Sequence, residues 1–334
     1  MESGGLASIS TIGIAGAGAW GVALANVAAR AGRRVILWGR GAEAMRGLAE
    51  TRQSPHLPGV TLASDIVVSA DIGALAPCEA ALVVVPAQAT RGVAEQLTRI
   101  LAGAAPLVAC AKGIELGADL FMTEVLAEAA PGHPAAILSG PSFAADVAAG
   151  LPTAVTLACA DEGRARALAL ALNSPNFRLY HSDDVRGVEI GGAAKNVLAI
   201  ACGIAAGLGL GPSAGAALIA RGFAELSRFG AAFGARPQTL MGLSGLGDLV
   251  LTCTSPQSRN FAFGLALGRG ANAAEAAAGK LAEGATTVRA LLEMARARNI
   301  EMPIAASVEA AIAGEEDMRA IVGKLLARPA RAEG

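Results

Sequence analysis

A glycine-rich turn near the N-terminus is the feature that most restricts how this chain can fold. The apolar run Thr11–Ala15 leads directly into Gly16-x-Gly18-x-x-Gly21. This spacing predicts a strand, a tight turn and a helix, because the first glycine turns without a Cβ, the second admits a pyrophosphate and the third lets helix and strand pack closely. Phosphates would then lie on the helix N-terminus, where free N–H groups favour anions. An ordinary glycine turn is the alternative, because the chain has 42 glycines.

The residues after the turn favour the dinucleotide-binding interpretation. Good helix formers fill 19–31, Gly32 ends that helix, and the apolar run 34–38 predicts a second buried strand. Arg40 follows about 20 residues after the turn, where NAD-selective domains carry an acidic residue that hydrogen-bonds the ribose 2′-hydroxyl. A guanidinium suits a 2′-phosphate, so the pattern indicates that NADP is accepted, with a solvated surface arginine as the alternative.

Strand and helix patterns alternate as far as about Ser182, and only helical patterns follow. This order predicts an α/β, Rossmann-like N-terminal domain with a mostly parallel sheet (1–184), then an all-α C-terminal domain (185–334). Further strands are expected at 80–85, 106–110, 135–138 and 152–158, and helices at 90–101 and 120–129. C-terminal helices are expected at 187–206, 213–233, 257–269, 271–280, 286–298 and 304–326.

The composition limits which kinds of partner the chain is expected to bind. The chain is 53% hydrophobic and 16% charged with a net charge of −1, which favours two sizeable cores and a small-molecule partner and argues against nucleic acid. Five widely spaced cysteines without a CxxC pair indicate reduced thiols, so we expect no disulfide and no metal site. The N-terminus lacks the pattern of a signal peptide, which predicts a cytoplasmic protein.

One uncharged segment, 197–220, is long enough to cross a bilayer. Glycines crowd this run and Pro212 would interrupt it, so we expect a buried helix, a loop and a second helix rather than a membrane span.

Two lysines are the candidates for chemistry. Lys195 shares one helix face with Ala199, Cys202 and Ala206, and a lysine on an otherwise apolar face needs a partner. Lys112 follows the strand expected at 106–110, and ligands bind at the carboxyl ends of strands in open α/β sheets.

Seven motifs in order resemble bacterial NAD(P)-dependent glycerol-3-phosphate dehydrogenase over essentially the whole chain. They are Gly16-Ala-Gly-Ala-Trp20-Gly21, Ala111-Lys112-Gly113, Leu138-Ser-Gly140-Pro141-Ser142-Phe143-Ala144, Gly187-Val-Glu189, Lys195-Asn196, Gly245-Leu-Gly247-Asp248 and Thr252-Cys253…Ser258-Arg259-Asn260. The resemblance implies a 6-phosphogluconate-dehydrogenase-like arrangement with the site between the domains. It also implies reduction of dihydroxyacetone phosphate to sn-glycerol 3-phosphate for glycerophospholipid synthesis, with NADP or NAD as cofactor.

The resemblance also implies roles for single residues. Lys195 is the implied proton donor and acceptor. The implied substrate-binding residues are Lys112, Gly140, Ser142, Lys195, Asp248, Ser258, Arg259 and Asn260. The implied cofactor-binding residues are Gly16, Gly18, Ala19, Trp20, Gly21, Arg40, Lys112, Ala144, Arg259, Leu281 and Glu283. Ala19 stands where a serine is common, which removes one hydroxyl contact to a phosphate.

Other interpretations stay open at this point. Lys195 could form an interhelical salt bridge with Glu189 or Asp248, Arg259 could lie on the surface, and Asp248 could be a helix cap. The same fold could act on a 2-hydroxy acid or ketopantoate, or could sense NADP without turnover. A homodimer is the assembly considered.

Overall fold

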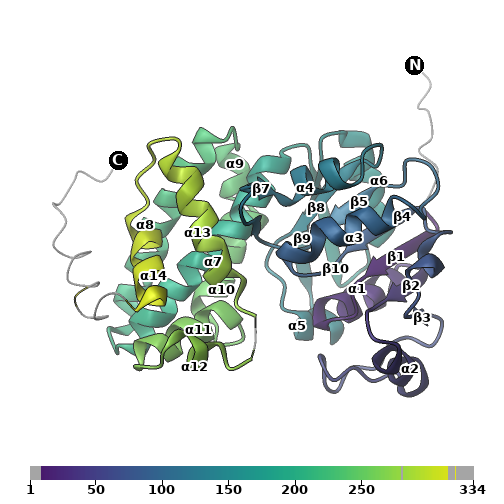
Figure 1. Cartoon of the computed structure of the whole chain (residues 1–334), viewed down its shortest axis with the longest axis horizontal. Coiled ribbons are helices and arrows are strands. Elements are labelled where there is room, and N and C mark those ends of the chain that lie inside the picture. The colour runs from purple at the N-terminus through teal and green to yellow at the C-terminus, as the bar shows by residue number, and fades with distance from the viewer. Residues whose placement is uncertain (1–8, 280, 315–319, 321–334) are drawn as a thin grey trace.

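The computed structural model describes residues 9–279, 281–314 and 320, which form two domains side by side along the long axis of the molecule (Figure 1). An eight-stranded sheet organises the N-terminal domain in the order β3-β2-β1-β4-β5-β8-β9-β10. All neighbouring strands are parallel except β8 and β9. The strands are β1 (Thr11–Ala15), β2 (Arg34–Trp38), β3 (Val67–Ser69), β4 (Ala80–Val83), β5 (Leu107–Ala109), β8 (Ala135–Ser139), β9 (Thr153–Cys159) and β10 (Phe177–Ser182).

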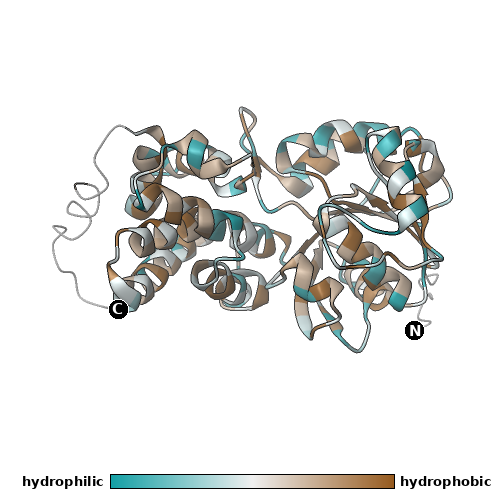
Figure 2. Cartoon of the chain, turned by 90° about the horizontal axis from the view of Figure 1, so that it is seen from below, coloured by the Kyte–Doolittle hydropathy of each residue, from teal (hydrophilic) through white to brown (hydrophobic). Residues whose placement is uncertain are grey.

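Helices cover both faces of this sheet, and each face has its own hydrophobic core. One core packs the sheet against α1 (Ala19–Arg30), α2 (Ala42–Thr51), α5 (Ala144–Ala148) and α6 (Glu162–Leu172). The other packs it against α3 (Thr90–Leu97), α4 (Met122–Ala129) and the short helix η1 (Ile72–Leu75). Figure 2 shows hydrophilic residues on the outer turns of these helices. The predicted mostly parallel sheet, covered on both faces, is confirmed.

The elements that the sequence reasoning missed include α2, α5 and three others. The edge strand β10 has a largely exposed pattern, so it lacks the apolar run by which the inner strands were recognised. Helix α6 was also overlooked. The third is a hairpin of β6 (Ile114–Glu115) and β7 (Leu120–Phe121), which is too short to have a readable period, and β7 occupies the start of the helix expected over 120–129.

The helical domain is built around α7 (Val185–Gly207), which is buried over most of its length. The surrounding helices are α8 (Gly211–Ala232), α9 (Pro237–Leu240), α10 (Asp248–Thr254), α11 (Arg259–Gly268), α12 (Ala273–Ala277), α13 (Glu283–Arg296) and α14 (Pro303–Ala313), with a π-helical turn, η3, at Leu243–Gly247. The predicted all-helical domain is confirmed, although the part of the last expected helix beyond 314 lies outside the described residues, except for residue 320.

The uncharged run 197–220 folds as a helical hairpin. It divides between the end of α7 and the start of α8, with a turn at Gly209. Among the described helices, α7 alone is long and apolar enough to cross a membrane, and 83% of its most apolar window is buried inside the protein. It is therefore the core helix of this domain, as expected for a buried helix, loop and second helix.

Backbone contact between α7 and α11 defines what we call the glycine seam, formed by Gly203, Gly207, Gly264 and Gly268. A Cβ at Gly264 would lie 2.1 Å from the carbonyl oxygen of Ile200, and one at Gly203 would lie 2.2 Å from that of Phe261. No side chain fits at that separation, so the two helices pack backbone to backbone. The seam fixes α11 against the last turns of α7.

Candidate active site

The glycine turn has the geometry of a phosphate cradle. Gly16 has a φ of +128°, and a Cβ there would lie 2.1 Å from the Val84 carbonyl oxygen. A Cβ at Gly21 would lie 1.8 Å from the Gly16 carbonyl oxygen, so α1 is pressed against the turn. Nothing lies within 4 Å of a Cβ at Gly18, which leaves open space before the N-terminus of α1. The residues present therefore fit a dinucleotide pyrophosphate.

A pocket of about 300 Å³ lies beside this turn and reaches the carboxyl end of β2. Its walls include Gly16, Gly18, Arg40, Ser54 and His56, and none of the described residues that line it is acidic. Arg40 is exposed and lines this pocket, at the position where the sequence predicts contact with the ribose. Ala19 and Trp20 form the first turn of α1, and the half-buried Trp20 packs against the core of that face.

The two candidate lysines meet at one carboxylate. Asp248 is 1% exposed and is the first residue of α10. Its Oδ1 accepts a hydrogen bond of 2.9 Å from Lys195 Nζ, and its Oδ2 accepts one of 2.7 Å from Lys112 Nζ. Lys195 also donates to Thr252 Oγ1 at 2.7 Å, and Lys112 to the Gly140 carbonyl at 2.8 Å. Each ammonium has three N–H groups, so each keeps one for a further acceptor.

Burial lowers the pKa of Lys195 to about 8. Loss of solvation is the largest cause, Asp248 opposes it, and the neighbouring charge of Lys112 lowers the pKa further. An amine with such a pKa exchanges its proton near neutral pH, which suits a general acid or base.

The fold explains why these side chains converge. Lys112 and Gly140 follow β5 and β8, whose carboxyl ends lie at the same edge of the sheet. Helix α7 lies directly on this edge, because a Cβ at Gly192 would lie 2.6 Å from Ser139 Oγ. Lys195 follows one turn later on α7. The half-buried Ser142 donates to the Gly140 carbonyl at 3.0 Å, beside Lys112.

A chain of amides connects the lysines to α11 and α13. Asn196 donates to the Lys112 carbonyl at 2.9 Å, and Asn260 donates to Asn196 Oδ1 at 2.9 Å. The Gly284 amide then donates to Asn260 Oδ1 at 2.9 Å. Asn260 is therefore part of one network with Lys112. The buried Ser258 lies outside it and caps α11 by accepting from the Phe261 amide at 3.2 Å.

Other predicted residues lie near the network without entering it. Arg259 is exposed in the first turn of α11, and none of the hydrogen bonds described holds its guanidinium. Glu283, in the first turn of α13, accepts from the Ala87 amide of η2 (Ala87–Ala89) at 3.4 Å and so reaches the other domain. Leu281 is 42% exposed, and Ala144 opens α5.

The structure shows which acidic residue pairs with Lys195. Its salt bridge is with Asp248 and not with Glu189. Glu189 instead accepts from the Thr123 amide at 2.7 Å and pairs with Arg186 at 3.4 Å. Asp248 is the first residue of α10 and not its N-cap, which is Gly247, and its carboxylate pairs with the two lysines.

The sequence reasoning assigned no role to two residues of this site, Thr252 and Asn196, although both stand in the motifs. Thr252 lies four residues after Asp248, a spacing that puts both on one helix face and was available from the sequence. Asn196 gave no such signal, because its two partners, Lys112 and Asn260, come from distant segments of the chain.

Fold and site together define a dinucleotide-dependent oxidoreductase with an α/β and a helical domain. Two sequence-family models match the chain: NAD-dependent glycerol-3-phosphate dehydrogenase N-terminus over residues 11–165, and C-terminus over residues 184–323. The chain belongs to the NAD-dependent glycerol-3-phosphate dehydrogenase family, which confirms the resemblance identified from the motifs.

Individual relatives agree. The chain is 62% identical over 324 residues to "Glycerol-3-phosphate dehydrogenase [NAD(P)+]" of Methylobacterium radiotolerans, covering 96% of this chain and 98% of that protein. It is 58% identical over 328 residues to the protein of the same name from Rhodopseudomonas palustris, covering 98% and 100%. The crystal structure of glycerol-3-phosphate dehydrogenase from Coxiella burnetii superposes with a TM-score of 0.91 at 39% identity, covering 96% of this chain and 99% of that one.

Proposed function

We propose that the protein interconverts dihydroxyacetone phosphate and sn-glycerol 3-phosphate by hydride transfer with NADPH or NADH. Family membership and the names of the relatives support the reaction. The observation that carries the mechanism is the shared carboxylate of Asp248, which holds two ammonium groups at the edge of the sheet that also bears the glycine turn.

Lys195 is the proton donor in this proposal. The bound nicotinamide supplies the hydride, and the ketone oxygen that gains negative charge needs a proton from a group within hydrogen-bond reach. The remaining N–H of Lys195 serves that oxygen, while Asp248 and Thr252 hold the amine in place. In the direction of alcohol oxidation, the same amine accepts the proton.

The second lysine and α11 bind the rest of the substrate. Lys112 polarises the ketone beside Gly140 and Ser142. The phosphate lies at the N-terminus of α11, where backbone N–H groups and charged or polar side chains favour an anion. The proposed phosphate ligands are Ser258, Arg259 and Asn260.

The residues that would hold the dinucleotide lie along the edge of the sheet. Gly16, Gly18 and Gly21 would hold its pyrophosphate, and Arg40 would contact its adenosine end. The remaining proposed contacts are Ala19, Trp20, Lys112, Ala144, Arg259, Leu281 and Glu283. We also propose a domain boundary at 184/185, a cytoplasmic location, a homodimer, and a role in supplying glycerophospholipid synthesis.

The test follows the oxidation of NADPH and NADH with dihydroxyacetone phosphate, using ketopantoate and a 2-oxo acid as control substrates. Among these three substrates, we expect turnover only with dihydroxyacetone phosphate. Lys195→Met should lower kcat by about 10²–10⁴-fold while NADPH binding stays near normal, because only the proton transfer is lost. Turnover of a control substrate, or NADPH binding without any turnover, would replace this proposal by one of the alternative functions.

A further inference from the structure

We propose that Gln88 is a positioning residue for Lys112, and that it acts through the hairpin of β6 and β7 that follows this lysine. The inference rests on the proposed function, because it takes the Lys112 ammonium as the group that polarises the ketone. Gln88 lies in η2, which follows β4, whereas Lys112 follows β5, so the contact joins two segments of the sheet domain. In this role Gln88 orients a reacting group without touching the substrate.

The Gln88 side chain pairs with the hairpin as a neighbouring strand would. Its Nε2 donates to the Ile114 carbonyl at 2.8 Å, and its Oε1 accepts from the Leu116 amide at 3.0 Å. The two backbone groups are two residues apart on one edge of the hairpin, which is the spacing that a parallel strand would use. One side chain thus supplies both bonds of a missing strand.

The hairpin is also fixed in the helical domain. Ile114 and Phe121 pair across it, are 0% and 1% exposed, and belong to the hydrophobic core around α7. The Phe121 ring packs edge-on against Phe233, with the ring centroids 5.6 Å apart, and the Arg186 guanidinium lies 4.2 Å from the Phe121 centroid. Figure 1 shows β7 at the junction of the two domains. The hairpin therefore connects the sheet domain to the helical core.

The chain passes through a narrow gap between Lys112 and the hairpin. A Cβ at Gly113 would lie 2.8 Å from the Ala87 Cβ and 3.3 Å from the Thr287 Oγ1, so η2 and α13 contact the backbone there. Gln88 is the next residue of η2, and its two bonds hold the chain directly after this gap.

A fixed backbone limits where the Lys112 ammonium can reach. Asn196 holds the Lys112 carbonyl at 2.9 Å from the helical domain, while Gln88 holds the hairpin from the sheet domain. Without the Gln88 bonds, the segment after Lys112 loses its restraint on the sheet side. The Lys112 Nζ would then keep its 2.7 Å bond to Asp248 for less of the time, and the ketone would meet a less well oriented donor.

A displaced Lys112 also changes the neighbouring amine, Lys195. Besides burial, the groups that act on the pKa of Lys195 are Asp248, Lys112 and Cys253, and the positive charge of Lys112 lowers this pKa. Movement of that charge away from Lys195 raises the pKa, so ketone reduction keeps its ammonium to higher pH. A side chain that only stabilised the fold would leave the pKa where it is.

The experiment measures kcat against pH for dihydroxyacetone phosphate reduction at saturating NADPH and ketone. The proteins are the wild type, Gln88→Met, Lys112→Met and the double variant, since methionine keeps the length of glutamine and removes both bonds. Gln88→Met should lower kcat about three- to tenfold and move the fall of kcat to higher pH. In the Lys112→Met background, the same substitution should change neither kcat nor the pH profile.

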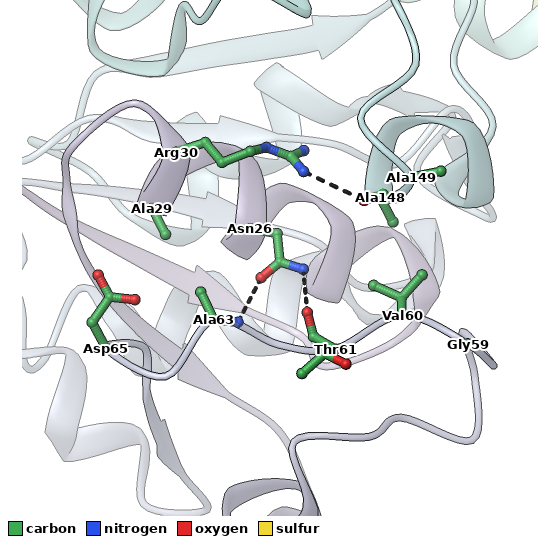
Figure 3. A pocket seen from close by; sticks show the side chains of 10 residues that line it. All are labelled: Asn26, Ala29, Arg30, Gly59, Val60, Thr61, Ala63, Asp65, Ala148 and Ala149. Atoms are coloured by element: carbon green, nitrogen blue, oxygen red, sulfur yellow. Dashed lines mark hydrogen bonds between the residues drawn. The ribbon is translucent and has the colours of Figure 1, made fainter.

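Asn26→Leu is the matched control, because the Asn26 amide makes the same pair of backbone bonds to another loop. It donates to the Thr61 carbonyl at 3.0 Å and accepts from the Ala63 amide at 2.9 Å. Figure 3 shows both bonds in a cavity of about 460 Å³ beside α1. Asn26→Leu should lower Tm while kcat at saturating substrates and its pH profile stay unchanged.

Each outcome decides the role of Gln88. A loss of kcat with the pH shift, both absent without Lys112, supports it. An unchanged kcat and pH profile, an equal loss in the Lys112→Met background, or the same loss in Asn26→Leu would overturn it. Absence of turnover in the wild type would overturn the proposed function and this inference with it, whereas wild-type turnover together with any of those three results would overturn this inference alone.

Discussion

Asp248→Asn is the sharpest test of the site, because one atom change removes the charge that two ammonium groups share. Asparagine keeps the shape of the side chain, so packing at this 1% exposed position is preserved. What is lost is a carboxylate bonded to Lys195 at 2.9 Å and to Lys112 at 2.7 Å. Leaving buried partners unpaired in this way costs about 3–5 kcal/mol of stability.

The effect on the pKa of Lys195 follows from the same contacts. Its pKa is about 8 with the carboxylate present, and Asp248 is the main group that raises it against burial. Loss of a charge-assisted hydrogen bond of about 1.5–3 kcal/mol, at about 1.36 kcal/mol per pKa unit, lowers the pKa by about one to two. The ammonium form is then scarce at neutral pH.

The assay is kcat as a function of pH, with saturating NADPH and dihydroxyacetone phosphate for ketone reduction, and with saturating NADP and sn-glycerol 3-phosphate for alcohol oxidation. Ketone reduction needs the ammonium, so kcat falls as pH rises through the pKa, and in Asp248→Asn this fall should move about one to two pH units lower. Alcohol oxidation needs the neutral amine, so its rise with pH should move lower as well. Asp161→Asn, which removes a charge at the cap of α6, is the matched control. If the pH profiles of kcat for Asp248→Asn coincide with those of the wild type in both reaction directions, the reasoning is refuted.

Three further perturbations test other parts of the structure. If the Arg259 guanidinium binds the substrate phosphate, Arg259→Ala should lower the ratio of kcat/KM for dihydroxyacetone phosphate to that for dihydroxyacetone by the equivalent of about 2–4 kcal/mol. An unchanged ratio would mean that other donors bind the phosphate. Burial raises the pKa of Glu189 from 4.5 to about 7, so the free energy of unfolding should fall by about 3 kcal/mol as pH rises between these values. Urea unfolding should show this fall in the wild type and not in Glu189→Gln. Gly264→Ala places a methyl group 2.1 Å from the Ile200 oxygen and should lower Tm, whereas Gly92→Ala, a helical position with nothing within 4 Å, should not.

The sequence was most informative where one residue type has one physical reason to be present. Gly16 and Gly21 were predicted to make a turn and a close helix contact, and each has the clash that excludes a side chain. Lys195 was predicted to need a partner, because an ammonium on an apolar helix face is costly alone. Both inferences depend on local chemistry, which a linear pattern carries.

The sequence was least informative where function depends on which segments meet. Nothing local shows that the loop with His56 folds back to the pocket beside Arg40, since that contact follows from the packing of the loop on α1. The choice between Glu189 and Asp248 as the partner of Lys195 also required the tertiary arrangement. Both are acidic, and only the turn before α10 decides which one reaches the amine.

The glycine seam makes the substrate half of the site rigid. Because α7 and α11 touch through their backbones, their spacing is set by peptide groups that offer no alternative rotamers. The Asn260–Asn196 bond lies at one end of this contact, with the N-terminus of α11 beside it. Bulk added at the far end of the seam, at Gly207 or Gly268, would push the last turn of α11 away from α7 and press its first turn toward Asn196, so a change remote from the substrate would alter the shape of the anion subsite.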